Sequence, residues 1–174
     1  MNLTIIGASA GVGLATVKRA LERNHTVTTL SRSEIDLPPN PYLIKLKGSA
    51  TNRTDLKKSL EKADAVIVAL GTGKSMKPTA LYSDFARVLV EVQREIEKDV
   101  PFIVLTGFGA GNSWGFQSNW LMELFFKFLL KDAYADKTNM EETITKSFLK
   151  WVIRHSPPLK CVNNIFEQSC PLSQ

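Results

Sequence analysis

The sequence predicts an α/β fold in which a doubly wound parallel sheet is covered by helices on both faces, giving three layers in a single domain. Two observations support this prediction. Short apolar segments typical of buried strands alternate with segments of helical spacing. The first apolar segment also runs directly into a glycine-rich turn that opens a helix. The length of 174 residues suits one domain with a substantial core.

The first half of the chain supplies the elements around this turn. Residues 3–6 form a short apolar run typical of a buried strand, and residues 14–21 space leucine and valine on one helical face. The β-branched run at 26–30 predicts a second strand. A proline-rich loop separates it from a third candidate strand at 43–46, and a short helix at 56–62 follows.

The second half repeats the alternation with longer helices. Residues 65–70 are a continuous apolar run that predicts a buried strand, and residues 80–98 have clear helical periodicity. Another buried strand is predicted at 102–105, ending in a glycine-rich loop. Two further helices and the start of a last strand complete the pattern, at residues 120–130, 133–147 and 151–153.

Composition excludes several classes of protein. The 44% hydrophobic and 22% charged content is typical of a globular domain. The longest apolar candidate for a membrane span is interrupted by Glu123 and Lys127, and the N-terminus lacks the basic segment of a signal peptide. Cys161 and Cys170 can form one disulfide, but two cysteines do not make a secreted framework. We therefore expect a cytoplasmic protein with no membrane association.

The net charge of +5 is spread along the chain, which slightly favours an anionic ligand and does not indicate nucleic acid. His25 and His155 have no sequence neighbours that suggest metal ligands, so no metal site is predicted. We expect a monomer or a homodimer that acts on a small molecule.

The glycine-rich turn GASAGVG, at residues 7–13, is the main functional motif. It follows a predicted strand and opens a predicted helix, which is the context that a dinucleotide-binding turn requires. Glycines allow a sharp turn and close approach of phosphates, and the helix N-terminus offers N–H groups and a positive dipole end. The predicted pyrophosphate-binding residues are Gly7, Ser9, Ala10, Gly11, Val12 and Gly13.

The residues that follow the second strand predict which dinucleotide binds. An acidic residue there would bond the ribose 2′-hydroxyl of NAD, but this chain has Ser31, Arg32 and Ser33. A guanidinium can pair with a 2′-phosphate, and hydroxyls add hydrogen bonds. NADP is therefore predicted over NAD, with NAD kept as the alternative because Glu34 and Asp36 follow closely; a solvated Arg32 is the plainer interpretation of that residue.

With these motifs in place, the chain resembles the atypical short-chain dehydrogenase/reductase group, in the NmrA-like NAD(P)H-binding family whose branch includes flavin reductases and biliverdin-IXβ reductases. The resemblance extends from residue 3 to about 153. It rests on GASAGVG, the Ser31-Arg32 pair, KADAVIVALGTG at 62–73, FIVLTGFGAGNS at 102–113 and YADKTNMEE at 134–142.

The resemblance implies a Rossmann-type fold with the cofactor over the carboxyl ends of the strands. It implies that Ser49 and Ala50 border the adenine, although relatives usually have an aspartate in place of Ser49. It places Thr106 and Gly107 near the nicotinamide, where relatives often have a serine pair. The residues implied to cover the ribose and pyrophosphate are Leu70, Gly71, Thr72 and Gly73.

The first glycine motif departs from this branch. NmrA-like relatives usually have G-x-x-G-x-x-G, whereas this chain has G-x-x-x-G-x-G, with Ala10 at the middle glycine and Gly11 after it. That spacing is similar to the typical short-chain dehydrogenases. Both versions make the same turn, so we expect cofactor binding to be retained.

Catalytic residues are less completely matched. Carbonyl-reducing relatives have a tyrosine four residues before a lysine on one helix, where the lysine holds the nicotinamide ribose and the tyrosine donates a proton. Here Lys137 and Glu141 match the K-x-x-x-E part, but Ala133 stands at the tyrosine position and Tyr134 is one residue late. Two alternatives stay open for each residue. Tyr134 either donates the proton from a shifted angle or only packs between helices. Lys137 either contacts the nicotinamide ribose or is an ordinary surface lysine. The candidate catalytic residues are Thr106, Tyr134 and Lys137.

Two function hypotheses follow, with a third as a fallback. The first is an NADP(H)-dependent oxidoreductase that transfers hydride to a flavin, a quinone or another small carbonyl compound, a reaction for which solvent can supply the proton. The second is a non-catalytic NADP-binding regulator of the NmrA-like kind, favoured by Ala133. A damaged isoform with neither role is the third.

The end of the sequence is the main departure from the family. We expect an NAD(P)-binding domain over residues 1–153 and a divergent tail over 154–174, since no family pattern is recognisable after Pro158. A shortened or alternatively spliced form and a partner-binding segment are both compatible with this tail. Each alternative affects the expected substrate pocket more than the N-terminal cofactor turn.

Overall fold

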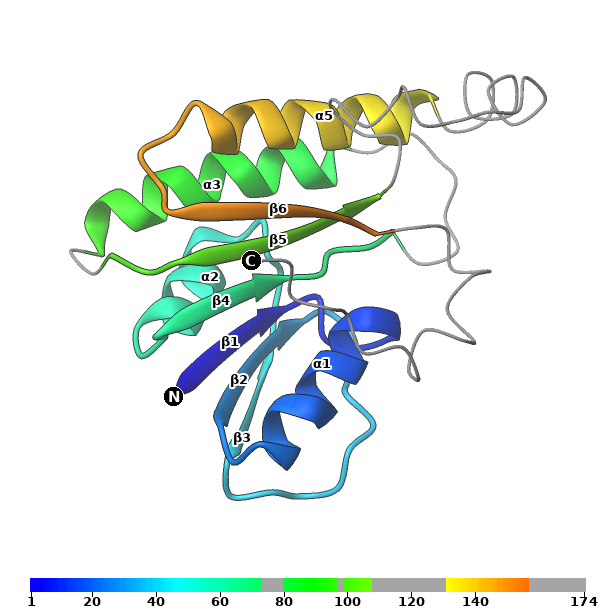
Figure 1. The fold of residues 1–174 in the computed structure, drawn as a ribbon, viewed down its shortest axis with the longest axis vertical. Coiled ribbons are helices and arrows are strands. Elements are labelled where there is room, and N and C mark those ends of the chain that lie inside the picture. Colours follow the sequence, from blue (N-terminus) through cyan, green and yellow to red (C-terminus); the bar gives the residue numbers. More distant parts are fainter. Residues whose placement is uncertain (73–79, 97–98, 108–130, 157–174) are drawn as a thin grey trace, which may run out of the picture.

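The protein folds around one all-parallel sheet with the strand order β3-β2-β1-β4-β5-β6 (Figure 1). A computed structural model describes residues 1–72, 80–96, 99–107 and 131–156. The strands are Asn2–Ile6 (β1), Thr26–Ser31 (β2), Leu43–Lys47 (β3), Ala65–Val68 (β4), Phe102–Gly107 (β5) and Trp151–Ser156 (β6). The helices are Gly11–Glu22 (α1), Arg53–Leu60 (α2), Leu81–Glu95 (α3) and Lys131–Thr145 (α5). This is the strand order of the doubly wound dinucleotide-binding fold, so the predicted fold class is confirmed.

Two separate hydrophobic clusters cover the two faces of the sheet. Neighbouring residues on a strand point to opposite faces, and on β1 Ile5 joins one cluster while Ile6 joins the other. The smaller cluster contains Val17 of α1, and the larger one contains Leu56 of α2 and Phe85 of α3. Helix α1 therefore covers one face, and α2, α3 and α5 cover the other (Figure 1).

Several predicted boundaries were wrong, each for a local reason. Helix α2 begins at Arg53 rather than at residue 56, because the Asn52 side chain accepts a hydrogen bond from the Asp55 N–H (3.1 Å) and caps it. Helix α3 ends at Glu95 rather than 98, because Ile96 has extended backbone angles (φ −89°, ψ 102°). Strand β4 ends at Val68 rather than at residue 70.

The last helix and strand also differ in extent from the prediction. Helix α5 spans 131–145 instead of 133–147, since residue 146 already lies in a turn. Strand β6 runs beyond residue 153 and pairs with β5 as far as Gly107 opposite Ser156. The helix predicted at 120–130 lies outside the described residues.

Helix α3 depends on α5 for its N-terminal cap. Its own N-cap residue, Ala80, has no side chain able to accept a hydrogen bond. Asp136 of α5 accepts hydrogen bonds from the backbone N–H groups of Tyr82 (2.9 Å) and Ser83 (3.0 Å), and from the Ser83 hydroxyl. Asp136 is buried, so its negative charge lies at the positive end of the α3 dipole in a site shielded from water. This contact fixes the position of α5 relative to α3.

We predict that Asp136→Ala lowers the free energy of unfolding by about 1–3 kcal/mol, because two helix N–H groups lose their acceptor inside the protein. Urea unfolding followed by circular dichroism measures the loss. Asn139→Ala is the matched control, since Asn139 lies on the same helix with an exposed side chain. Equal unfolding midpoints for the two variants would contradict the capping role.

Candidate functional site

The residues predicted to bind the cofactor gather at one edge of the sheet. All six strands in the described part of the chain are parallel, so their carboxyl ends meet at the same edge. The chain leaves β1 for α1 on one face and leaves β4 for α3 on the other, which places the switch point between these two neighbouring strands. Ligands of doubly wound sheets bind in the crevice outside this point.

The three glycines of the β1–α1 turn have different steric roles. Gly7 has φ +85°, and a Cβ there would overlap the carbonyl of Ala69 after β4. A Cβ on Gly13 would overlap the carbonyl of Gly7, so Gly13 allows α1 to pack closely on the turn. Gly11 has φ +56° with open space where its Cβ would be. The outer glycines are needed for packing, while the middle one leaves room for a ligand.

The N-terminus of α1 suits an anion. The N-cap residue is Ala10, with extended backbone (φ −158°, ψ 172°) and no side-chain cap, and the first turn contains no acidic residue. First-turn N–H groups have no intrahelical partner, and an anion can accept hydrogen bonds from them. Ser9 is half-buried and Val12 is exposed at this turn. These features fit a pyrophosphate group.

The turn after β2 carries one basic side chain, that of Arg32, at the same edge of the sheet. Ser31 is buried; its hydroxyl donates to the carbonyl oxygen of Ser33 (2.8 Å), and its own carbonyl accepts from the Gly48 N–H (3.0 Å). Ser31 therefore shapes the turn. Arg32 and Ser33 are exposed, as are Glu34 and Asp36.

The turn after β3 is held by a residue that the sequence interpretation missed. The Asp55 carboxylate accepts a hydrogen bond from the Ser49 N–H (2.9 Å), and the Ser49 hydroxyl lies 2.9 Å from that of Thr51. Ala50 is buried in the larger cluster. The spacing of Asn52 and Asp55, a cap residue and an acid three positions later, is the sequence signal that could have identified this turn.

The β4 turn is described only in part. Leu70 packs against the larger hydrophobic cluster, Gly71 is exposed and Thr72 is half-buried. Gly73 lies outside the described residues. The structure therefore puts Leu70 and Gly71 at the carboxyl edge, directly after the Ala69 carbonyl that contacts Gly7.

The carboxyl end of β5 carries a buried hydroxyl. Thr106 is 6% exposed, and within the described part of the chain its Oγ1 atom has no hydrogen-bond partner. Buried hydroxyls are normally hydrogen-bonded, so this atom is available to a ligand group. Gly107 is the last residue of the strand.

Lys137 lies on α5 in a partly desolvated environment. Burial lowers the pKa of its ammonium group, and the negative charge of Glu141, one turn later, opposes that shift. The Nζ atom is 5.2 Å from the centroid of the Tyr82 ring on α3, which is cation–π distance. The backbone of Tyr134 belongs to α5, but its side chain is outside what the structure describes.

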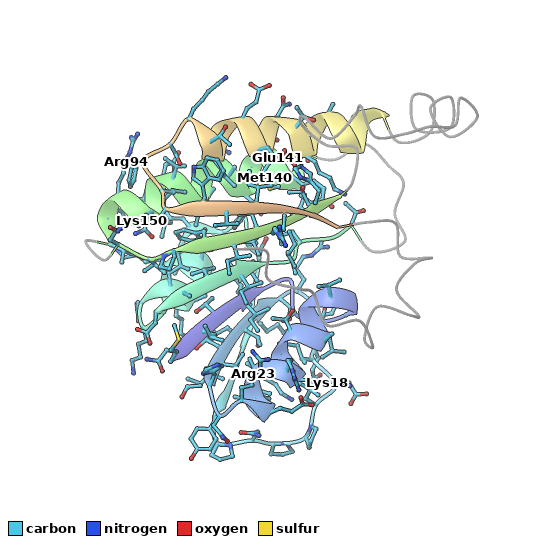
Figure 2. The ribbon with its side chains drawn as sticks, in the orientation of Figure 1. Lys18, Arg23, Arg94, Met140, Glu141 and Lys150 are labelled. Carbon is cyan, nitrogen blue, oxygen red and sulfur yellow. The ribbon has the colours of Figure 1, made fainter. Side chains whose placement is uncertain are left out.

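Glu141 and His155 form a pair that was not predicted. His155 Nε2 lies 3.3 Å from both carboxylate oxygens of Glu141, with hydrogen-bond geometry to Oε2. Glu141 is buried, on the side of α5 that faces α3 and the sheet (Figure 2). His155 is at the end of β6, where it pairs in register with Thr106. The predicted strand at 151–153 stops two residues before His155, so no sequence signal placed His155 beside Glu141.

A cavity in the described residues lies away from the glycine turn. It has a volume of about 490 Å³ and is lined by the end of α3 and the segments that precede β5 and β6. Arg94 and Lys150, which line it, are labelled in Figure 2 at the amino ends of these strands. It is therefore at the opposite edge of the sheet from the glycine turn.

The described residues also bear on two other kinds of function. They contain no cluster of three or more histidine, cysteine or acidic side chains suited to a metal ion. None of their helices combines the length and apolar character needed to cross a membrane.

The strand order, the glycine turn and the open N-terminus of α1 define a dinucleotide-binding protein of the Rossmann type. Residues 7–160 match the family described as NAD(P)H-binding, and the chain belongs to that family. The family resemblance predicted from the sequence is therefore confirmed.

Solved structures share this fold at low sequence identity. An anaerobillin reductase from Escherichia coli is 18% identical with a TM-score of 0.64, over 89% of this chain and 72% of that protein. A protein from Streptococcus pneumoniae, proposed as an NADH-flavin reductase, is 23% identical with a TM-score of 0.65, over 88% of this chain and 70% of its own. The NAD complex of WbmG from Bordetella bronchiseptica is 14% identical with a TM-score of 0.68; the match covers 89% of this chain but only 52% of WbmG.

We predict that two alanine substitutions in the glycine turn affect different properties, namely ligand binding for Gly11→Ala and thermal stability for Gly13→Ala. Gly11→Ala has space for its methyl group and loses only about 1 kcal/mol of stability to its positive φ, but it obstructs the phosphate approach and weakens NADPH binding. Gly13→Ala forces α1 away from Gly7 and lowers the melting temperature more than Gly11→Ala does. Thermal unfolding and NADPH fluorescence titration measure the two effects. If Gly11→Ala binds NADPH like the wild type, the open space is not the phosphate site.

Proposed function

We propose that the protein is an NADPH-dependent reductase of the atypical short-chain dehydrogenase type, which transfers a hydride to a small flavin, quinone or carbonyl acceptor. The observation that carries the proposal is the buried Thr106 hydroxyl, which has no hydrogen-bond partner among the described residues and lies at the edge of the sheet where the glycine turn is. The bound cofactor would supply the hydride. The protein would supply orientation and electrostatics.

The assignment of the two halves of the cofactor follows from the fold. A doubly wound sheet has two mononucleotide-binding halves, one on each side of the switch point. Arg32 and Ser49 follow β2 and β3, so the adenosine half belongs on that side. The nicotinamide half then belongs over the ends of β4, β5 and β6, where Thr106 and Lys137 lie. Lys137 would contact the nicotinamide ribose.

The preference for NADPH rests on Arg32. The Ser31 hydroxyl donates to Ser33 and is not available as a donor to a phosphate, so the exposed guanidinium is the group suited to the 2′-phosphate. Glu34 and Asp36 are also exposed nearby, and the WbmG structure contains NAD, so NAD is the alternative.

The acceptor class is suggested by chemistry and by the neighbours. Conjugated acceptors such as flavins need stacking and orientation more than a dedicated acid. The structural neighbours include an anaerobillin reductase and a protein proposed as an NADH-flavin reductase. The proposal also includes a cytoplasmic location and a monomer or homodimer. The predicted boundary between a cofactor domain over residues 1–153 and a tail over 154–174 falls inside β6, so the proposal keeps β6 as far as Ser156 in the cofactor domain.

A non-catalytic NADP-binding regulator is the second candidate, favoured by Ala133 at the position of the usual tyrosine. One experiment separates it from the reductase. The purified protein is titrated with NADPH by fluorescence and then mixed with FMN, menadione and an aromatic aldehyde while NADPH absorbance is followed. We expect binding and turnover of at least one acceptor. Binding without turnover supports the regulator, and absence of binding contradicts both.

We predict that Arg32→Ala weakens NADPH binding about 10- to 100-fold, the equivalent of one lost charge-assisted pair, and leaves NADH binding unchanged. Arg23→Ala is the matched control, because Arg23 is an exposed arginine at the other end of α1 (Figure 2). Parallel titrations with NADPH and NADH measure both affinities. Equal losses for the two nucleotides would show that Arg32 does not bind the 2′-phosphate.

A further inference from the structure

We propose that His155 donates the proton during acceptor reduction and that Glu141 is the positioning residue that holds its ring. The inference rests on the proposed reductase function and adds a residue to it. It answers the question raised by Ala133, which leaves the usual proton-donor position on α5 without a titratable group.

The placement of His155 follows from the register of the last two strands. His155 is opposite Thr106, and Ile153 is opposite Val104. Val104 belongs to the hydrophobic cluster under α3 and α5, and Ile153 packs against that cluster. Because strand residues two apart share a face, Thr106 and His155 both lie on this face at the carboxyl edge. This is the side of the switch point assigned to the nicotinamide half.

Glu141 fixes one nitrogen of the ring. Glu141 is 7% exposed, and its carboxylate lies 3.3 Å from His155 Nε2. Among the described residues Nδ1 makes no hydrogen bond, so this nitrogen is the one that can exchange a proton with an acceptor or with water. A carboxylate that holds one imidazole nitrogen fixes the orientation of the other.

Three polar groups in the described part of the chain bear on the environment of the Glu141–His155 pair. Lys137 lies one turn before Glu141 on α5 and attracts it, while its Nζ also faces the Tyr82 ring of α3. The Asp136 carboxylate faces the N–H groups at the start of α3 and not this pair. From β5 the neighbouring polar group is the Thr106 hydroxyl. Glu141 is therefore the charged group in direct contact with the His155 ring.

The reaction step is balanced with these groups. A hydride carries one hydrogen and two electrons. It adds to the carbon of a carbonyl compound, or to one oxygen of a quinone, and the displaced π electrons leave negative charge on the carbonyl oxygen or on the other quinone oxygen. The proton on His155 moves to that oxygen and forms the O–H bond. The ring takes back a proton from water, and NADP⁺ is released. The sum is NADPH, one proton and a carbonyl or quinone giving NADP⁺ and the alcohol or hydroquinone.

The test compares an acceptor that needs the proton with one that does not. Menadione develops charge on oxygen, whereas FMN accepts hydride on a ring nitrogen and can leave as an anion. We expect His155→Gln to lower kcat for menadione about 100-fold, the usual contribution of a general acid, with FMN reduction and NADPH affinity unchanged. In His155→Ala, added imidazole should restore menadione turnover. His25→Gln is the matched control, since His25 lies before β2 at the amino edge.

Glu141→Gln tests the positioning role. It should lower kcat for menadione about tenfold without changing KM, and circular dichroism verifies its fold. If Glu141→Gln does not fold, the His155 variants decide the result.

The inference is overturned if His155→Gln slows both acceptors equally or neither, or if the wild type reduces FMN but not menadione. In all three cases the proposed reductase stands. If the wild type binds NADPH and reduces nothing, the reductase itself is wrong, which is a distinguishable result.

Discussion

The rest of the structure depends on a steric constraint at the β1–α1 turn, where three backbone segments meet without room for a side chain. The Gly7 position is closed by the Ala69 carbonyl, and the Gly13 position by the Gly7 carbonyl. The backbone bond from Ala69 N–H to the Ile6 carbonyl (2.8 Å) ties the same segments together. Because α1 packs this closely, its N-terminus lies at the edge of the sheet where the other described cofactor-site candidates lie. Close packing and ligand access are thus set by one turn.

Helix α5 is attached to the molecule by polar contacts as much as by apolar ones. Its buried residues include Met140 and Ile144, but also two carboxylates, Asp136 and Glu141. Each buried acid has a defined partner: Asp136 accepts from the N-terminus of α3, and Glu141 meets His155 of β6. Removing such a partner costs more than the contact contributes, because an unpaired buried charge remains. The helix therefore has one favoured position, which holds Lys137 against the Tyr82 ring of α3.

The fold and the cofactor turn could be predicted from sequence because both depend on local pattern. Apolar runs identified every strand, and glycine spacing after the first strand identified the turn. Helix ends were less accurate because they depend on caps such as Asn52 and on backbone angles such as those of Ile96. The roles of Asp136 and Glu141 were not predictable, since acidic residues on a polar helix are usually solvated. The partner of Asp136 at Ser83 is 53 positions away in the chain.

The alanine at the N-cap of α1 leaves the first-turn N–H groups without a side-chain acceptor, so a ligand can accept their hydrogen bonds. A serine or aspartate there would satisfy a first-turn N–H group permanently and would compete with a phosphate for the same donor. With Ala10 those donors are left to water until an anion arrives. An anion that accepted hydrogen bonds from these donors would bind only the folded turn, so its occupancy and folding would be coupled equilibria. A phosphate bound there would accept the hydrogen bonds that an N-cap side chain accepts in other helices.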